Sequence, residues 1–214
     1  MIDFEFILPA GWVVLPTTPD TTRLRTWAID AVIKQYIPDS LPRDSAEPWR
    51  RELRKQLLAT TDDAERNGAR SVVLPLGGYN GARIPGSMII TVLEDPEPQD
   101  PERLLASILE DAGSHGTYLE IGGAPAARIA AVVEHVAFGQ TKPGHRVSYY
   151  LSHPDVPGVW GLLTFTVMTD GDLENPASLG IVALFDAIVS TLRWAQRESV
   201  PTEDEVLATL GAAL

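Results

Sequence analysis

The sequence predicts an α+β fold in which a mostly antiparallel β-sheet of about six or seven strands packs against helices. Residues 117–169 contain four strand-like runs separated by turn residues, as in a meander of antiparallel strands. Apolar residues recur at the helical spacing of three and four in residues 22–37 and 178–197. The length of 214 residues and the apolar share of 44% suit a globular chain, which we expect to form a single α+β domain over residues 1–214.

The first third of the chain predicts two strands followed by two helices. FEFI (4–7) and WVVL (12–15) are apolar runs separated by Pro-Ala-Gly, which indicates a hairpin or a bent strand pair. A helix is expected over residues 22–37. Prolines then interrupt the chain before a second, charged helix, which is expected to run from Trp49 to the Asn-Gly stop at 67–68.

The middle of the chain predicts two further strands and a third helix. Residues 71–76 and 87–94 have the composition of strands, and a glycine-rich loop lies between them. Apolar residues on both sides of the second run indicate that it lies inside the sheet. After an acidic, proline-rich connector, Asp100 at the N-cap and Pro101 at the first helical position predict a helix that ends at Gly113.

The last long element is expected to be an amphipathic helix over residues 178–197. Its apolar side, which includes Phe185, should pack on the sheet. Asp186, Ser190 and Arg193 fall on the other side and are expected to form a stripe facing solvent. On this interpretation, replacing Phe185 by alanine is costly and replacing Asp186 by alanine has almost no effect on stability.

The charge and the residue types limit the classes of partner and cofactor. A formal net charge of −12 repels phosphate backbones and anionic lipid, so we expect no nucleic-acid partner. No apolar run approaches the roughly 18–20 residues of a spanning helix, so no membrane insertion is expected. The chain has no cysteine, and its four histidines lack the close spacing of metal ligands. We therefore predict neither a metal nor a cofactor.

The N-terminal residues indicate a cytoplasmic protein. They include Asp3 and Glu5 instead of a basic segment, and Pro9 interrupts the apolar stretch before it reaches the length of a signal peptide. The sequence thus predicts a soluble intracellular chain.

Catalytic motifs do not occur in the sequence, which contains neither G-x-S-x-G nor a glycine-rich phosphate-binding loop of known spacing. We therefore predict no catalytic residues and favour a role other than catalysis. The alternative is a hydrolase-like enzyme whose site is assembled from separated residues, with Arg128, Glu134, His135 and Asp186 as candidates. A pocket that brings two of them within hydrogen-bond reach would favour this alternative, and simple salt bridges would favour a binding module.

Two strand-like runs, RVSYYLSH and VWGLLTFTV, suggest a binding surface. Residues of a core face alternate along them with an outer set that includes Arg146, Tyr150, Trp160 and Leu162. If no helix covers this outer set, it forms an exposed aromatic patch that binds a protein or a small ligand. If a helix covers it, these side chains belong to the core, and both possibilities stay open at this point. Self-association through the same face would make the chain a homo-oligomeric structural protein.

The ILPAGW strand pair, the run of strands ending in VWGLLTFTV and the terminal LFDAIVSTLRW helix together resemble the Mog1p/PsbP-like α+β fold, as found in small actinobacterial proteins of unknown function. The resemblance covers residues 4–15 and 117–195. It implies an antiparallel sheet between helices and a binding or assembly module, accessory to a secretion or envelope system. The two helices expected over 22–67 and the acidic connector depart from this family, which has no shared catalytic motif to carry over.

Overall fold

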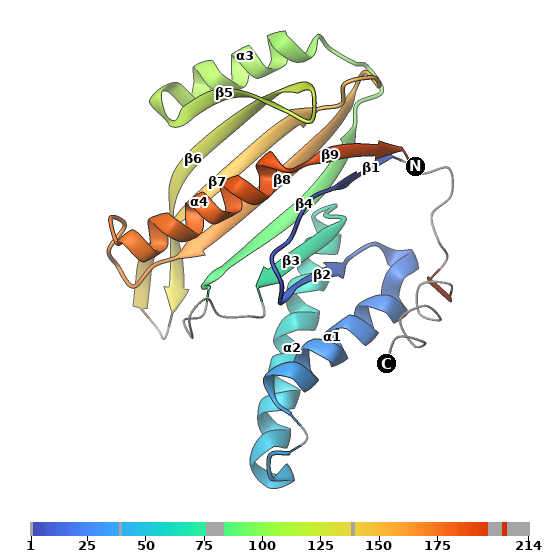
Figure 1. The fold of residues 1–214 in the computed structure, drawn as a ribbon, viewed down its shortest axis with the longest axis vertical. Helices are drawn as coiled ribbons and strands as arrows, with labels where there is room; N and C mark the ends of the chain where they lie inside the picture. The colour runs from blue at the N-terminus through green and yellow to red at the C-terminus, as the bar shows by residue number, and fades with distance from the viewer. Residues whose placement is uncertain (1, 39, 76–83, 138–139, 197–202, 205–214) are drawn as a thin grey trace.

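The computed structural model describes the chain except for residues 1, 39, 76–83, 138–139, 197–202 and 205–214 (Figure 1). Strands and helices follow one another in an α+β arrangement, which confirms the predicted fold class. In chain order they are β1 (Ile2–Glu5), β2 (Trp12–Pro16), α1 (Thr22–Tyr36), α2 (Arg43–Arg66), β3 (Ser71–Pro75), β4 (Gly86–Glu94), α3 (Pro101–Ala112), β5 (Gly116–Ile121), β6 (Ala124–Ala137), β7 (Gln140–Ser152), β8 (Val159–Met168), α4 (Pro176–Ser190) and β9 (Arg193–Gln196).

A seven-stranded antiparallel sheet forms the centre of the fold, with the strand order β2-β3-β4-β8-β7-β6-β5. The predicted meander is confirmed, because β5, β6, β7 and β8 pair with one another in sequence order. β4 pairs with β3 on one side and β8 on the other, so it lies inside the sheet as expected.

The predicted pairing of the two N-terminal strands is wrong. β1 pairs with β9 in a separate two-stranded ribbon, whereas β2 pairs with β3 at the edge of the main sheet. Between them, Phe6 and Leu8 pack against the core cluster instead of continuing a ladder. An apolar run predicts a strand, but it does not identify the strand's partner when that partner is distant in sequence.

Two predicted helix limits also differ from the structure. α2 begins at Arg43 instead of Trp49, and Pro48 lies within it. A proline there removes one backbone hydrogen bond without ending the helix. α4 ends at Ser190, and residues 193–196 form β9 instead of a last helical turn. By contrast, Asp100 caps α3 as predicted, since its side chain accepts a hydrogen bond from the Glu102 N–H at 3.1 Å.

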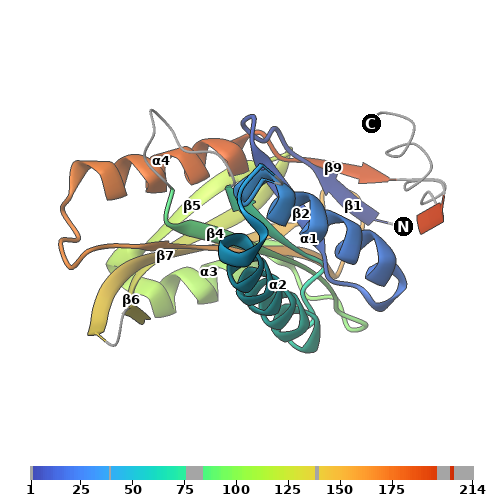
Figure 2. The same cartoon turned by 90° about the horizontal axis from the view of Figure 1, so that it is seen from below.

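Different elements cover the two faces of the main sheet (Figures 1 and 2). α4 and the β1–β9 ribbon lie on one face, and α2 and α3 lie on the other. On the α4 face Phe185 is fully buried as expected, and its ring stacks on Phe165 with centroids 4.5 Å apart. Trp12 meets the same ring edge-on at 5.1 Å. The main core thus lies between α4 and the sheet.

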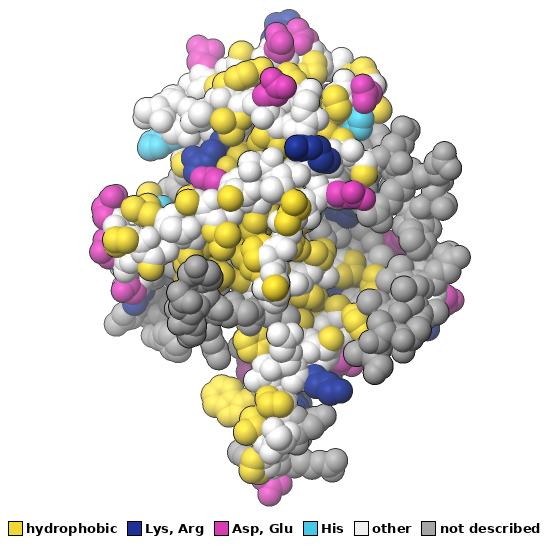
Figure 3. Space-filling view, in the orientation of Figure 1, with side chains coloured by type: hydrophobic (Ala, Val, Ile, Leu, Met, Phe, Trp, Pro, Cys, Tyr) yellow, Lys and Arg dark blue, Asp and Glu magenta, His cyan; other side chains and the backbone are white. Residues whose placement is uncertain are grey.

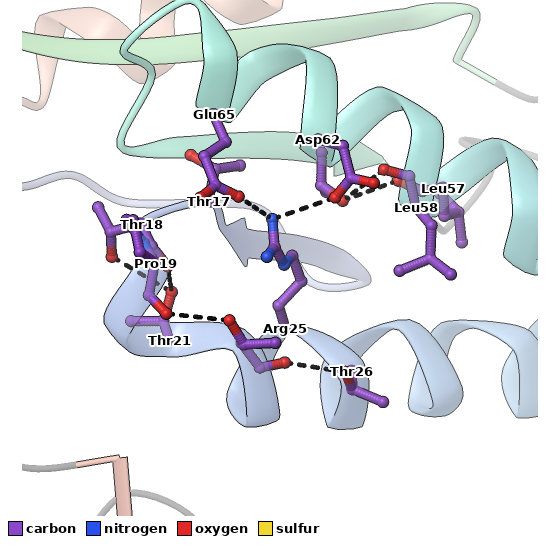
Figure 4. A network of polar contacts seen from close by, with 12 residues as sticks. Thr17, Thr18, Pro19, Thr21, Arg25, Thr26, Leu57, Leu58, Asp62 and Glu65 are labelled. Carbon is purple, nitrogen blue, oxygen red and sulfur yellow. Dashed lines mark hydrogen bonds and ion pairs between the residues drawn. The ribbon is translucent and has the colours of Figure 1, made fainter.

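α1 and α2 form an antiparallel helical hairpin that projects beyond the sheet (Figure 1). Ion pairs join its two helices, one between Arg54 and Asp30 and another between Arg25 Nη1 and Glu65 Oε2 at 2.8 Å. Arg25 is buried between the helices, and Figure 4 shows its guanidinium pointing at Asp62 and Glu65 of α2. These contacts hold the two helices side by side. They thereby set the width of the space between the ends of α1 and α2 that point away from the sheet.

Candidate binding site

A cavity of about 740 Å³ lies where the projecting part of the hairpin meets the end of β3. Most of the side chains around it are apolar. The cavity is lined by Val32, Tyr36 and Ile37 from α1 and its end, Leu41 from the connection, Ala46, Trp49, Glu52, Leu53, Gln56 and Leu57 from α2, and Leu74, Pro75 and Gly86 from the sheet. We refer to this space as the hairpin groove.

The α2 wall of the groove follows from the helical repeat. Ala46, Trp49, Leu53 and Leu57 recur at spacings of three and four, so their side chains share one side of the helix. Ala46 and Leu57 are buried and form the floor, whereas Trp49 and Leu53 rise toward solvent. The helical spacing of these residues is visible in the sequence, but it does not show that part of this side lies beyond the sheet.

Polar contacts fix the α1 wall and the tip of the hairpin. Tyr36 Oη donates a hydrogen bond to the Pro75 carbonyl at 3.3 Å, which ties the end of α1 to the end of β3. Arg50 donates from Nε and Nη2 to the Ile37 carbonyl at 3.2 and 3.1 Å, and from Nη2 to the Pro38 carbonyl at 3.0 Å. Carbonyls at a helix C-terminus otherwise lack partners, so Arg50 both caps α1 and positions the connection.

The rim of the groove is apolar and open. Trp49 is 70% exposed and Leu41 is 47% exposed. Figure 3 shows hydrophobic side chains on the lower, projecting part of the molecule. Figure 1 places the tip of the α1–α2 hairpin there. Among the described residues that line the groove, Glu52 is the charged one, and its carboxylate accepts a hydrogen bond from Gln56 Nε2 at 2.9 Å.

The surface predicted from the sequence lies elsewhere, on the sheet face that carries α3. Trp160 is only 8% exposed and packs with Leu105 of α3 and with Ala127, and Tyr150 packs half-buried against the same cluster. Leu162 is also half-buried, whereas Arg146 is exposed. Of the two possibilities that the sequence left open, the covered one applies at Trp160, because α3 packs over it. A binding role for these four residues is untested and stays a prediction.

Two of the residues considered for an assembled enzyme site do meet. Arg128 of β6 donates from Nε and Nη2 to the two carboxylate oxygens of Asp186 of α4, at 3.1 and 3.0 Å. Tyr149 Oη of β7 donates to Asp186 Oδ1 at 2.5 Å. Burial raises the pKa of Tyr149 far above its ordinary value, and the hydrogen bond to Asp186 and its negative charge act in the same direction.

This cluster of Arg128, Tyr149 and Asp186 has the character of a structural salt bridge. The Asp186 carboxylate already accepts three hydrogen bonds, and the raised pKa keeps the tyrosine protonated, so neither group is poised as a base. Glu134 is exposed and six residues farther along β6, a distance of about 20 Å in a strand. The side chain of His135 lies outside the described residues.

The predicted polar stripe of the last helix is only partly right. Ser190 is exposed, and its hydroxyl donates to the Ala187 carbonyl at 2.7 Å. Asp186, by contrast, is half-buried against the sheet with a charged partner, and Arg193 lies in β9 instead of the helix. Helical spacing placed Asp186 away from Phe185, but it could not show that two long side chains of the sheet reach that side of α4.

Neither a metal-binding cluster nor a membrane-spanning helix occurs in the part of the chain that the structure describes. Within the described residues, no group of three or more His, Cys, Asp or Glu side chains is arranged to hold a metal ion. The described helices also include none that combines the length and the apolar character needed to cross a membrane.

No protein-family model matches the sequence, and no curated protein matches it in sequence. Solved structures with a related arrangement include LpqN of Mycobacterium tuberculosis, described as involved in cell envelope biogenesis, with 11% identity over 92% of this chain and 85% of that one and a TM-score of 0.44. They also include the Ran-binding protein Mog1p of Saccharomyces cerevisiae, with 11% identity over 57% of this chain and 77% of that one and a TM-score of 0.36. A Bacteroides thetaiotaomicron structure matches 61% of this chain with 12% identity and a TM-score of 0.39, and the chain spans 40% of that protein's length. Mog1p, which gives its name to the fold that the sequence resembles, is thus among the solved structures with a related arrangement.

Proposed function

We propose that this chain is a non-catalytic binding module whose hairpin groove holds an apolar segment of a partner protein. The observation that carries the proposal is the exposure of Trp49 on the rim of a cavity of about 740 Å³. A tryptophan left in water beside an apolar hollow is a common anchor of protein interfaces, where aromatic residues provide much of the binding energy.

The exposure of the rim favours a protein over a small ligand. Small-molecule sites are concave and enclose most of the surface of their ligand. Here two apolar side chains of the rim, Trp49 and Leu41, are exposed beside the cavity and would stay largely in contact with water around a small ligand. A polypeptide that lies across the groove covers both of them.

The net charge argues against a second copy of the chain as the occupant. Each copy carries a formal charge of −12, so two copies repel each other. The role in a secretion or envelope system that the sequence resemblance implies, and the cytoplasmic location, stay predictions.

Selection of peptides from a random displayed library tests the proposal. The full chain is the target, and a Trp49→Ser variant serves for counter-selection. Because Trp49 is exposed, the variant should fold normally, and we expect enriched peptides to bind it about tenfold or more weakly than the wild-type chain, as for a hot-spot tryptophan. The affinity is measured by isothermal titration calorimetry.

The matched control is Tyr118→Ser, which removes another exposed aromatic side chain from β5, far along the sheet order from the groove. Peptides that bind this variant and the wild-type chain equally support a site at the groove. Binders that are insensitive to Trp49→Ser, or a selection that yields no binders, would contradict the proposed function.

A further inference from the structure

We infer that Glu203 and Asp204 form a latch that caps the first turn of α1, and that salt releases it. We refer to these two residues as the C-terminal latch. The latch contacts the start of α1, whereas the hairpin groove is lined by residues near the other end of that helix. The inference therefore does not depend on what the groove binds. It follows from an uncapped helical turn, from two contacts made by distant residues, and from the exposure of those contacts.

The first turn of α1 lacks the local cap that α3 and α4 have. Asp100 caps α3 and Asn175 caps α4, since each side chain accepts a hydrogen bond from a backbone N–H of the first turn. At the same position before α1, the Thr21 side chain accepts no such bond, and its hydroxyl donates to the Thr18 carbonyl at 2.7 Å (Figure 4). Because the first N–H groups of a helix have no acceptor within it, α1 needs one from elsewhere.

Glu203 supplies this acceptor from the opposite end of the chain. Its Oε1 accepts a hydrogen bond from the backbone N–H of Leu24, the third residue of α1, at 2.5 Å. Beside it, Asp204 Oδ1 accepts a hydrogen bond from Arg23 Nη1 at 2.5 Å. Figure 1 places the described residues 203 and 204 next to the start of α1. Two successive carboxylates thus contact two successive residues of one helical turn, where the helix dipole also favours negative charge.

These contacts are exposed to water, which makes the latch reversible. The side chains of Arg23 and Asp204 are 66% and 79% exposed. The hydrogen bond and the charge of Asp204 raise the pKa of Arg23 above its ordinary value, and the charge of Glu203 acts in the same direction. Attraction between exposed charges is weak and is screened by salt, so the latch should open at high ionic strength while the core of the protein stays folded.

Arg25 limits how far the release of the latch can spread. It follows Leu24 in α1, and it is buried and bonded to Glu65 of α2 (Figure 4). A turn that loses its cap frays from its end, and the fraying stops where a packed residue holds the helix. Release of the latch should therefore free residues 22–24 and leave the α1–α2 hairpin closed.

Hydrogen exchange of single backbone amides in the full chain, followed by NMR, tests the inference. Glu203→Ala removes the acceptor without changing the neighbours of Leu24 in the sequence, so the intrinsic exchange rate of the Leu24 amide stays the same. We expect this amide to exchange about three- to tenfold faster in the variant than in the wild type, as for the loss of a helix cap. The amide of Val32, in the buried middle of α1, should exchange at the wild-type rate.

Salt gives the second measurement. Raising the salt concentration from about 0.05 to 0.5 M should accelerate exchange at Leu24 in the wild type and have much less effect in Glu203→Ala, where the latch is already open. Glu110→Ala, which removes an exposed carboxylate from α3, is the matched control and should retain both the wild-type rate and its dependence on salt.

Three results would overturn the inference. A wild-type exchange rate at Leu24 in Glu203→Ala would mean that Glu203 does not cap the helix. Equal acceleration at Leu24 and Val32 would show that α1 opens as a whole instead of at its first turn. The same response to salt in Glu203→Ala as in the wild type would show that salt does not act through the latch.

Discussion

Asp186 shows how a single side chain can have a different role from the one that helical spacing predicts. It receives two hydrogen bonds from Arg128 and one from Tyr149, so α4 is joined to β6 and β7 by a polar contact at the margin of the apolar core. A half-buried cation that loses its carboxylate keeps the cost of its partial desolvation without the compensating attraction.

Asp186→Ala should therefore lower the free energy of unfolding by about 1–2 kcal/mol, because Arg128 and Tyr149 lose their acceptor. Urea denaturation of the purified chain measures this change. Ser190→Ala, on the exposed side of the same helix, is the control and should stay within about 0.5 kcal/mol of the wild type. Equal effects of the two substitutions would mean that the cluster contributes nothing to stability.

His153 makes the stability of the turn between β7 and β8 depend on pH. Its Nδ1 accepts hydrogen bonds from the backbone N–H groups of Asp155 and Val156, both at 3.0 Å, and its ring lies 4.7 Å from that of Trp194. Burial lowers the pKa of His153 below its ordinary value near 6.5, although the charge of Asp155 acts in the opposite direction. A proton on Nδ1 would displace both hydrogen bonds.

Because the pKa of His153 is lower in the folded chain, the unfolded chain binds more protons below about pH 6.5, and stability should fall as the pH drops through that value. His153→Asn keeps an acceptor for the turn but does not titrate, so its stability should depend less on pH between about 7 and 5. Thermal unfolding at several pH values measures the slope. His115→Asn, at an exposed position, should retain the wild-type slope, and a wild-type slope in His153→Asn would refute the assignment.

At the scale of elements, the α1–α2 hairpin depends on an ion pair of unequal burial. Arg25 is buried, whereas its partners Glu65 and Asp62 are partly exposed. The buried cation has already paid the larger desolvation cost, so the two ways of breaking the pair are not equivalent. Removing Glu65 takes away the nearer carboxylate and leaves the buried cation with the more exposed Asp62 at 3.5 Å, whereas removing Arg25 leaves two carboxylates that water can reach.

Glu65→Ala should consequently destabilise the chain more than Arg25→Met does. We expect a loss of about 1–3 kcal/mol for the first, and a change within about 1 kcal/mol for the second, because methionine keeps the packing of the aliphatic part. Urea denaturation compares the two variants. Arg66→Ala, which breaks an exposed pair with Asp63, is the control and should have almost no effect. The opposite order for Glu65 and Arg25 would contradict this account.

At the scale of the whole molecule, the sequence predicted those parts that depend on neighbours in the chain. The meander from β5 to β8 and the capped helix α3 follow from turn residues, alternation and capping, all of which are local. The pairing of β1 with β9 and the cover of α3 over Trp160 join distant segments, and no local pattern encodes them.

The hairpin groove was missed for the same reason. Apolar residues recur at helical spacing along α1 and α2, but this spacing does not show how much of each helix the sheet covers. The structure shows that the sheet covers only part of the hairpin and leaves Trp49 and Leu41 in solvent. A signal was present in the length of α2, whose 24 residues extend far beyond the five residues of β3 on which it packs.

The pairing of β1 with β9 also determines which part of the fold can form first while the chain is being synthesised. Ile2 pairs with Gln196, so β1 waits for a partner strand that is synthesised nearly 200 residues later. At about 5–20 residues per second this delay is of the order of 10–40 s, long enough for the meander to fold first. During that interval the surface that Phe6 and Leu8 finally cover is open, which makes the nascent chain, more than the finished protein, dependent on protection from aggregation.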